Sequence, residues 1–159
     1  MRRLSLTLVL LLSLLCHASA GPAIFIIRHA EKADSTSKDP DLSDAGRARA
    51  ESIARMLRDA KITAIYVTEF KRTQETAEPL SRATGISPTV VSASATTDLV
   101  AQLKRASGNV LAVEHGNTIP DVMKGLGLTD PITIGENDYD NLFIVDLTDP
   151  PHLLRLYLP

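Results

Sequence analysis

The stretch Ala23-Ile24-Phe25-Ile26-Ile27-Arg28-His29-Ala30 decides how this 159-residue chain folds. Its first five residues are apolar without interruption and rich in β-branched side chains. Such a run is typical of a strand that is buried on both faces of a sheet. The run ends abruptly at a cation and an imidazole, Arg28 and His29. The sequence therefore predicts an interior strand with reactive side chains at its carboxyl end.

A second run of the same kind, residues 109–113, stops at Glu114-His115-Gly116-Asn117. Around these two runs, strand patterns are expected at residues 62–67, 88–92, 142–146 and 153–158, and helical patterns at residues 45–60, 71–84, 97–106 and 119–126. Strands that alternate with helices indicate an α/β fold. We expect a three-layer α/β/α sandwich, with a mainly parallel sheet and helices on both faces.

Local signals at the helices lead to two smaller expectations. Either Ser43 or Asp41 is expected to cap the first helix, and either Thr96 or Thr97 the third. The methionines at helical spacing are expected to fill the core: Met56 and Met123.

Composition excludes several classes of protein. Hydrophobic residues make up 44% and charged residues 23%, close to an ordinary globular protein, which excludes a disordered chain, a collagen and a coiled-coil rod. Lys and Arg number 17 against 19 Asp and Glu, for a net charge of −2. Because nucleic-acid binders usually have a basic excess, no nucleic-acid partner is expected.

The first twenty residues have the pattern of a secretory signal peptide. Arg2 and Arg3 precede an apolar run at residues 8–15, and Ala18-Ser19-Ala20 supplies small residues for cleavage after Ala20. Residues 1–20 are thus expected to be a signal peptide and residues 21–159 one domain, periplasmic or secreted. The apolar run is short for a bilayer span, which needs about 20 residues, so no stable membrane span is expected after cleavage. The alternative is a leader that is kept as an anchor.

Reactive side chains follow three of the predicted strands. Arg28 and His29 end the first, residues 68–71 lead from the second into Arg72, and His115 follows the run at 109–113. Ligands of open α/β sheets bind beyond the carboxyl ends of the strands, so these side chains are expected to meet. Guanidinium groups offer forked donors to a tetrahedral oxyanion, and an imidazole can act as a nucleophile. The pattern predicts an anion site that contains a nucleophile, with phosphate as the anion.

These motifs resemble those of the histidine phosphatase superfamily, the phosphoglycerate mutase-like proteins. The family's Arg-His-Gly corresponds to Arg28-His29-Ala30, and its Ser-x-Leu-x-Arg-Ala-x-x-Thr-Ala resembles residues 68–77. The remaining similar motifs are Leu42-Ser43-Asp44-Ala45-Gly46, His115-Gly116-Asn117-Thr118 and Tyr139-Asp140-Asn141-Leu142-Phe143. The matches occur in the family's order. The chain is similar to small exported bacterial members and lacks the length of the mutases.

The resemblance implies an enzyme, a phosphoric monoester hydrolase. His29 would be the nucleophile that forms a phosphohistidine. The implied catalytic and substrate-binding partners are Arg28, Arg72, His115, Asn117 and Glu31. The substrate would be a small phosphomonoester or phosphorylated group, and no metal or other cofactor is implied, because two arginines neutralise the phosphate.

One family feature is missing from the sequence. Many members have a Leu-x-Glu after the third strand, whose Glu protonates the leaving oxygen, but residues 91–99 contain no Glu. General acid catalysis is typically worth 10²–10⁴-fold. Either the leaving group needs no acid, or another carboxylate serves. The candidates are Glu31, Glu69, Asp98 and Glu114, of which Glu114 is favoured because it adjoins His115.

Two other functions remain open at the level of the sequence. The same pocket could bind phosphate or a phosphorylated ligand without turnover, the activity having been lost with the acid. A metal hydrolase could use His29, Glu31 and His115, although the usual metal-ligand spacings are missing. The sequence does not indicate the oligomeric state.

Overall fold

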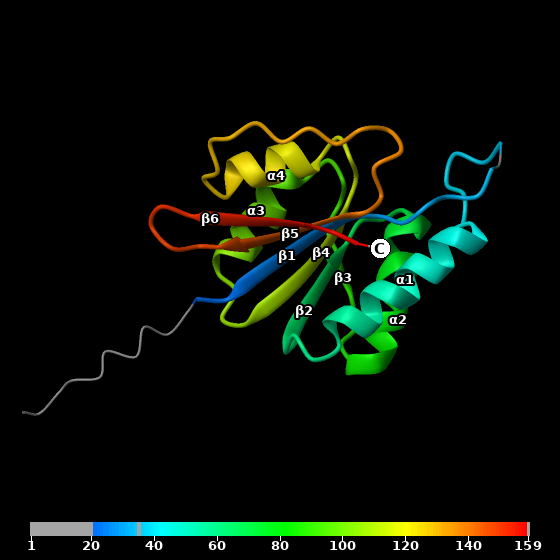
Figure 1. Cartoon of the computed structure of the whole chain (residues 1–159), viewed down its shortest axis with the longest axis horizontal. Coiled ribbons are helices and arrows are strands. Elements are labelled where there is room, and N and C mark those ends of the chain that lie inside the picture. Colours follow the sequence, from blue (N-terminus) through cyan, green and yellow to red (C-terminus); the bar gives the residue numbers. More distant parts are fainter. Residues whose placement is uncertain (1–20, 35, 159) are drawn as a thin grey trace, which may run out of the picture.

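A six-stranded sheet and four helices make up the part of the chain that the computed structural model describes, residues 21–34 and 36–158 (Figure 1). In chain order the elements are β1 (Ala23–Arg28), α1 (Asp44–Leu57), β2 (Ile62–Val67), α2 (Lys71–Thr84), β3 (Thr89–Val90), α3 (Thr96–Lys104), β4 (Asn109–Glu114), α4 (Ile119–Gly125), β5 (Asn141–Asp146) and β6 (His152–Tyr157). The predicted order of strands and helices is confirmed, with boundaries that shift by a few residues.

The strand order β3-β2-β4-β1-β5-β6 places β4 between β1 and β2. The pairs β1–β4, β2–β4 and β2–β3 are parallel, whereas β5 is antiparallel to both β1 and β6. The expectation of a mainly parallel sheet is confirmed. Because β1, β2 and β4 are parallel neighbours, their carboxyl ends meet at one edge, as the strand-end motifs required.

The core lies on both faces of the sheet. Side chains of β1 alternate between the faces: Phe25 and Ile27 join the cluster formed with α1 and α2, and Ile24 and Ile26 join the cluster formed with α3 and α4. This alternation is the period-two geometry of a strand buried on both sides. The two helix layers enclose the sheet in Figure 1, and the predicted α/β/α sandwich is confirmed.

The start of α1 is fixed against the loop that follows β1. Ser43 caps the helix, since its hydroxyl accepts the N–H of Gly46 at 3.0 Å, and Asp41 does not serve as the cap. The Ser43 N–H in turn donates to the carbonyl of Glu31 at 2.9 Å. A Cβ at position 46 would overlap that same carbonyl oxygen, so this close approach requires glycine.

The predicted cap of the third helix and the predicted burial of Met56 are wrong. The N-cap of α3 is Ala95, without a side-chain cap bond, and both Thr96 and Thr97 lie inside the helix. Met123 is buried as expected, but Met56 is 45% exposed, because it lies on the side of α1 that faces away from the sheet.

The predicted signal peptide lies outside the described residues. Within residues 21–34 and 36–158, no helix has the length and hydropathy needed to cross a membrane.

Candidate active site

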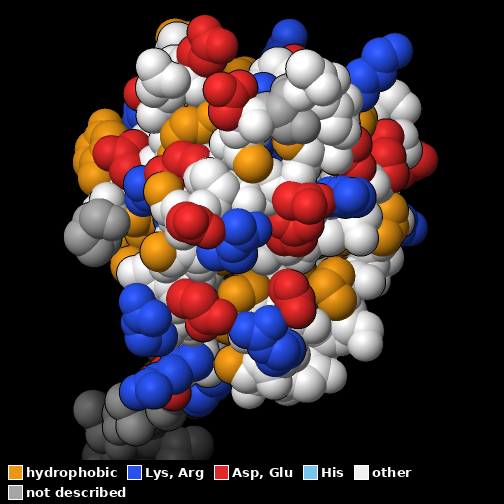
Figure 2. All heavy atoms as spheres, turned by 90° about the vertical axis from the view of Figure 1, so that its right-hand side faces the viewer, with side chains coloured by type: hydrophobic (Ala, Val, Ile, Leu, Met, Phe, Trp, Pro, Cys, Tyr) orange, Lys and Arg blue, Asp and Glu red, His pale blue; other side chains and the backbone are white. Residues whose placement is uncertain are grey.

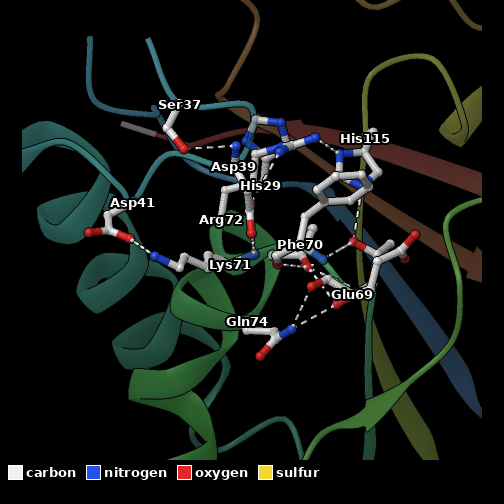
Figure 3. A network of polar contacts seen from close by, with 12 residues as sticks. His29, Ser37, Asp39, Asp41, Glu69, Phe70, Lys71, Arg72, Gln74 and His115 are labelled. Carbon is white, nitrogen blue, oxygen red and sulfur yellow. Dashed lines mark hydrogen bonds and ion pairs between the residues drawn. The ribbon is translucent and has the colours of Figure 1, made fainter. Parts of the chain in front are cut away.

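The carboxyl ends of β1 and β4 bring two imidazoles together. His29 follows β1, and its backbone N–H donates to the carbonyl of Glu114 at 2.8 Å, which extends the parallel pairing by one residue. His115 follows β4, and the two rings lie with centroids 5.3 Å apart (Figure 3). Both side chains are buried, so the sheet itself fixes their positions.

The hydrogen bonding and burial of His29 keep its imidazole neutral. Its Nδ1 lies 2.8 Å from the carbonyl oxygen of Ala30, which can only accept, so Nδ1 carries the ring proton and Nε2 keeps its lone pair. Burial lowers the pKa of His29 to about 4; the positive charges of Arg72 and Arg28 also lower it, against the opposing effect of the Ala30 hydrogen bond. At neutral pH the imidazole is therefore uncharged, with Nε2 able to attack.

Arg28 is held on two sides. Its Nη1 donates to the carbonyl oxygens of Gly135 at 2.9 Å and Glu136 at 2.7 Å, and its guanidinium lies 4.2 Å from the ring centroid of Tyr139. Its buried Nε has no hydrogen-bond partner among the described residues. A buried donor without a partner is rare and costly, so this edge of the guanidinium suits an oxyanion.

Arg72 enters the site from the first turn of α2. Its guanidinium lies 4.3 Å from the ring centroid of Phe70, and its Nη1 lies 3.7 Å from a carboxylate oxygen of Asp39. Asp39 also accepts the N–H of Lys71 at 3.1 Å. Burial lowers the pKa of Arg72, but an arginine remains charged at any physiological pH. The second fixed positive charge of the site is therefore in place.

A chain of hydrogen bonds orients His115. Its Nε2 lies 3.0 Å from the hydroxyl of Thr68, and its Nδ1 lies 3.4 Å from Nη2 of Arg72 (Figure 3). Because Arg72 can only donate, Nδ1 accepts and Nε2–H donates to Thr68, whose own hydroxyl lies 3.0 Å from that of Thr73. Burial, and next the charge of Arg72, lower the pKa of His115 to about 4.

These side chains surround an open cavity of about 730 Å³. The sequence-predicted residues that line it are Arg28, His29, Arg72, His115 and Asn117. Two positive charges and two neutral imidazoles thus meet at one concave surface. Such a surface can hold a tetrahedral dianion with a nucleophile beside it.

Two other predicted site residues do not line the cavity. Glu31 forms an ion pair with Arg49, which donates from Nη2 at 2.8 Å and from Nε at 2.9 Å. Glu114 is buried and accepts the hydroxyl of Thr118 at 2.7 Å; burial raises the pKa of its carboxyl. The structure therefore does not bring Glu31 to the phosphate site, and it places Glu114 beneath the site.

The remaining candidate acids are also absent from the cavity wall. The carboxylate of Glu69 accepts the N–H of Ala93 at 2.8 Å, and Asp98 lies in the first turn of α3. The carboxylates that do line the cavity are those of Asp34 and Glu136, which are both exposed.

Sequence reasoning missed three supports of the two arginines. They are Tyr139 and the carbonyls of Gly135, Glu136 and Asp138 around Arg28, and Asp39 beside Arg72. The motif that begins at Tyr139 was a signal that this residue matters. Nothing local in the sequence linked Asp39 to Arg72, because they are 33 positions apart.

Groups of three or more His, Cys, Asp or Glu side chains that could hold a metal ion are absent from the part of the chain that the structure describes.

The fold and site define an α/β domain. At the carboxyl edge of its parallel strands it has a positively charged site that suits an oxyanion. Residues 24–99 match the family model of the histidine phosphatase superfamily (branch 1). This match includes β1 with His29 and the start of α2 with Arg72. Over these residues, slightly less than half of the chain, the sequence is similar to the histidine phosphatase superfamily.

Solved structures with the same fold extend the comparison over most of the chain. The protein histidine phosphatase SixA, complexed with tungstate, has a TM-score of 0.65 at 19% identity; the match covers 85% of this chain and 96% of that one. A mycobacterial glucosyl-3-phosphoglycerate phosphatase with inorganic phosphate has a TM-score of 0.66 at 16% identity, covering 87% and 97%. Among curated proteins, no sequence matches the chain significantly.

Proposed function

We propose that this protein is a metal-independent phosphatase that acts through a phosphohistidine on His29. The observation that carries the proposal is the state of that imidazole: Nδ1 is tied to the Ala30 carbonyl, the pKa is about 4, and Nε2 keeps its lone pair. Two guanidinium groups, Arg28 and Arg72, line the same cavity. A neutral nucleophile between two fixed cations suits attack on a phosphate dianion.

The reaction has two displacements at phosphorus. In the first, Nε2 of His29 forms a bond to phosphorus while the bond to the leaving oxygen breaks, and that oxygen takes a proton from water or an acid. In the second, water attacks phosphorus, the N–P bond breaks and inorganic phosphate leaves with the oxygen of that water. Arg28 and Arg72 stabilise the charge on the transferring oxygens in both steps, and His115 positions Arg72 by accepting a hydrogen bond from its guanidinium at Nδ1.

We propose further that good leaving groups are favoured. The four carboxylates considered as acids from the sequence do not line the cavity, and the two that line it, Asp34 and Glu136, are exposed. Aryl phosphates, whose phenolate leaving groups need little protonation, should therefore be cleaved much faster than alkyl phosphates. Glu114 is the alternative acid, since burial raises the pKa of its carboxyl.

The test of the nucleophile is to trap the intermediate. Rapid mixing with labelled p-nitrophenyl phosphate, followed by digestion, should place an acid-labile, base-stable phosphate on the peptide that contains His29. His29→Ala should abolish label and turnover. His152→Ala is the matched control, because that imidazole lies on β6, exposed and outside the cavity wall. A His29→Ala variant with most of its activity would refute the covalent mechanism.

Turnover separates the phosphatase from a binding module of the same fold. p-Nitrophenyl phosphate needs no acid, so slow but measurable hydrolysis is expected even if alkyl phosphates are inert. Tight phosphate binding without any hydrolysis of p-nitrophenyl phosphate would favour the binding module. If Glu114→Gln slows alkyl phosphates by 10²–10⁴-fold and spares p-nitrophenyl phosphate, Glu114 is the acid.

For the location, we propose export with cleavage after Ala20, on the pattern of residues 1–20. The substrates would then be phosphorylated groups outside the cytoplasm. Mass spectrometry of protein from the envelope fraction should find Gly21, or a residue close to it, at the amino terminus. A full-length protein in the cytoplasm would refute export, and a full-length protein in the membrane would support a retained anchor.

A further inference from the structure

The cavity is larger than the phosphoryl site needs. At about 730 Å³ it lies in the range of pockets that hold whole organic ligands of about 300–1,000 Å³, and a phosphate group held by Arg28 and Arg72 would fill only part of it. The rest of the wall must therefore contact the group to which the phosphate is attached.

Part of that wall comes from the loop between β1 and α1, which places two lysines at the cavity, Lys32 and Lys38. Both are exposed, and neither ammonium forms an ion pair or a hydrogen bond with a residue that the structure describes. Two carboxylates of the same loop are engaged elsewhere. Asp39 lies beside Arg72 and accepts the Lys71 N–H, and Asp41 pairs with the Lys71 ammonium at 3.0 Å (Figure 3).

The unpaired state of these lysines contrasts with the neighbouring surface. Acidic and basic side chains are interspersed on the face of Figure 2, which is the side of Figure 1 where α1 and α2 lie. Two arginines of α1 and α2 are paired: Arg82 with Glu51 and Glu78, and Arg47 with Asp44. Unpaired cations at a concave wall are available to a ligand.

The charged side chains of the cavity wall include two lysines besides the two arginines. The charged side chains that line the cavity are four cations, Arg28, Arg72, Lys32 and Lys38, and two carboxylates, Asp34 and Glu136. The two arginines lie beside the nucleophile and are matched by one phosphate dianion. The two lysines come from the loop between β1 and α1, and neither forms an ion pair with Asp34, Glu136 or any other carboxylate of the described residues.

We propose that Lys32 and Lys38 form a second anion subsite, and that the substrate class is phosphorylated compounds that carry another carboxylate or phosphate. The proposal rests on the phosphatase function proposed above and specifies its substrate. Lysine suits this task, because its flexible point charge accepts anionic groups at different distances, whereas the arginines fix the transferred phosphate.

The experiment compares substrates that differ in one charge. Phenyl phosphate is the reference, and para-carboxyphenyl and para-(carboxymethyl)phenyl phosphate are the charged probes, with leaving oxygens of similar basicity. For each enzyme the measured quantity is the ratio of kcat/KM for the better charged probe to kcat/KM for phenyl phosphate. Because the ratio is taken within one enzyme, a general loss of activity cancels.

The wild type should prefer the charged probe, and Lys32→Gln and Lys38→Gln should each lower the preference by roughly twofold to fivefold, the usual effect of an exposed ion pair. Lys104→Gln, which removes the same charge from an exposed position on α3, should leave the ratio unchanged. Salt at about 1 M should reduce the wild-type preference, because it shortens the screening length to about 3 Å.

Failure of the subsite and failure of the phosphatase function are distinguishable. Hydrolysis of phenyl phosphate with no preference for either charged probe, or an equal effect of Lys104→Gln, would refute the subsite alone. No hydrolysis of any probe would refute the phosphatase function. In that case calorimetry with phenylphosphonate and para-carboxyphenylphosphonate decides the subsite: tighter binding of the charged compound, lost in the Lys32 and Lys38 variants, supports it, and equal binding overturns it.

Discussion

Mild acid should destabilise the folded protein because two buried imidazoles must take up protons on unfolding. Burial lowers the pKa of His29 and His115 to about 4, whereas in the unfolded chain both should titrate near the ordinary value of 6.5. The unfolded state therefore binds more protons below pH 6.5. The free energy of unfolding should fall as the pH drops through 6.5, and this contribution should level off below about pH 4.

The size of the effect follows from the two pKa values of each histidine. Lowering the pH from about 7 to about 5 should reduce the free energy of unfolding by about 2 kcal/mol per histidine, or about 4 kcal/mol for the pair. A domain of this kind has about 5–15 kcal/mol in total, so the loss is large.

Urea unfolding followed by circular dichroism measures this loss directly. The wild type, His29→Gln and His152→Gln should each be unfolded at the two pH values. His29→Gln should lose only about half as much stability as the wild type, because one of the two buried imidazoles is gone. His152→Gln controls for the removal of an exposed imidazole and should lose as much as the wild type.

The decisive comparison is between the three proteins, in the free energy of unfolding that each loses from about pH 7 to about pH 5. Carboxylates contribute equally to all three proteins and cancel. If His29→Gln and the wild type lose the same stability between the two pH values, His29 is not held neutral by burial, and the basis for its role as a ready nucleophile falls.

Three further outcomes are expected. Gly46→Ala should lower the free energy of unfolding by about 1–3 kcal/mol, because the new Cβ meets the Glu31 carbonyl; a more stable variant in urea unfolding would contradict this contact. Hydrolysis of p-nitrophenyl phosphate should survive EDTA and be inhibited by vanadate, whereas activity that EDTA removes and Zn²⁺ or Mg²⁺ restores would indicate a metal enzyme. Tyr139→Leu should raise the Kd for inorganic phosphate by roughly 2–10-fold in calorimetry, because it removes the ring beneath Arg28, while Tyr139→Phe should not; equal effects would contradict the stacking role.

Much of the fold could be predicted from the sequence because its signals are local. A continuous apolar run such as residues 23–27 can bury both faces only as an interior strand, and Gly85, with a φ of 75°, marks the end of α2. The motifs at the strand ends were equally readable, since neighbouring parallel strands bring His29, Arg72 and His115 to one edge wherever the helices lie.

Whether a side chain reaches the cavity depended on contacts that no local pattern encodes. Glu31 stands two residues from His29, yet it turns to Arg49 on α1, and Glu114 adjoins His115 but lies beneath the site against Thr118. Met56 has the spacing of a core residue, but it lies on the side of α1 that faces away from the sheet and is exposed.

The tertiary structure also decided what holds the two arginines. Tyr139 and three carbonyls of the loop before it reach Arg28 from more than a hundred positions away, and Asp39 reaches Arg72 from the loop after β1. Periodicity and motifs report the backbone conformation of neighbouring residues. Which distant residues contact each other across the site depends on how whole helices, strands and loops pack, and only the three-dimensional structure shows this packing.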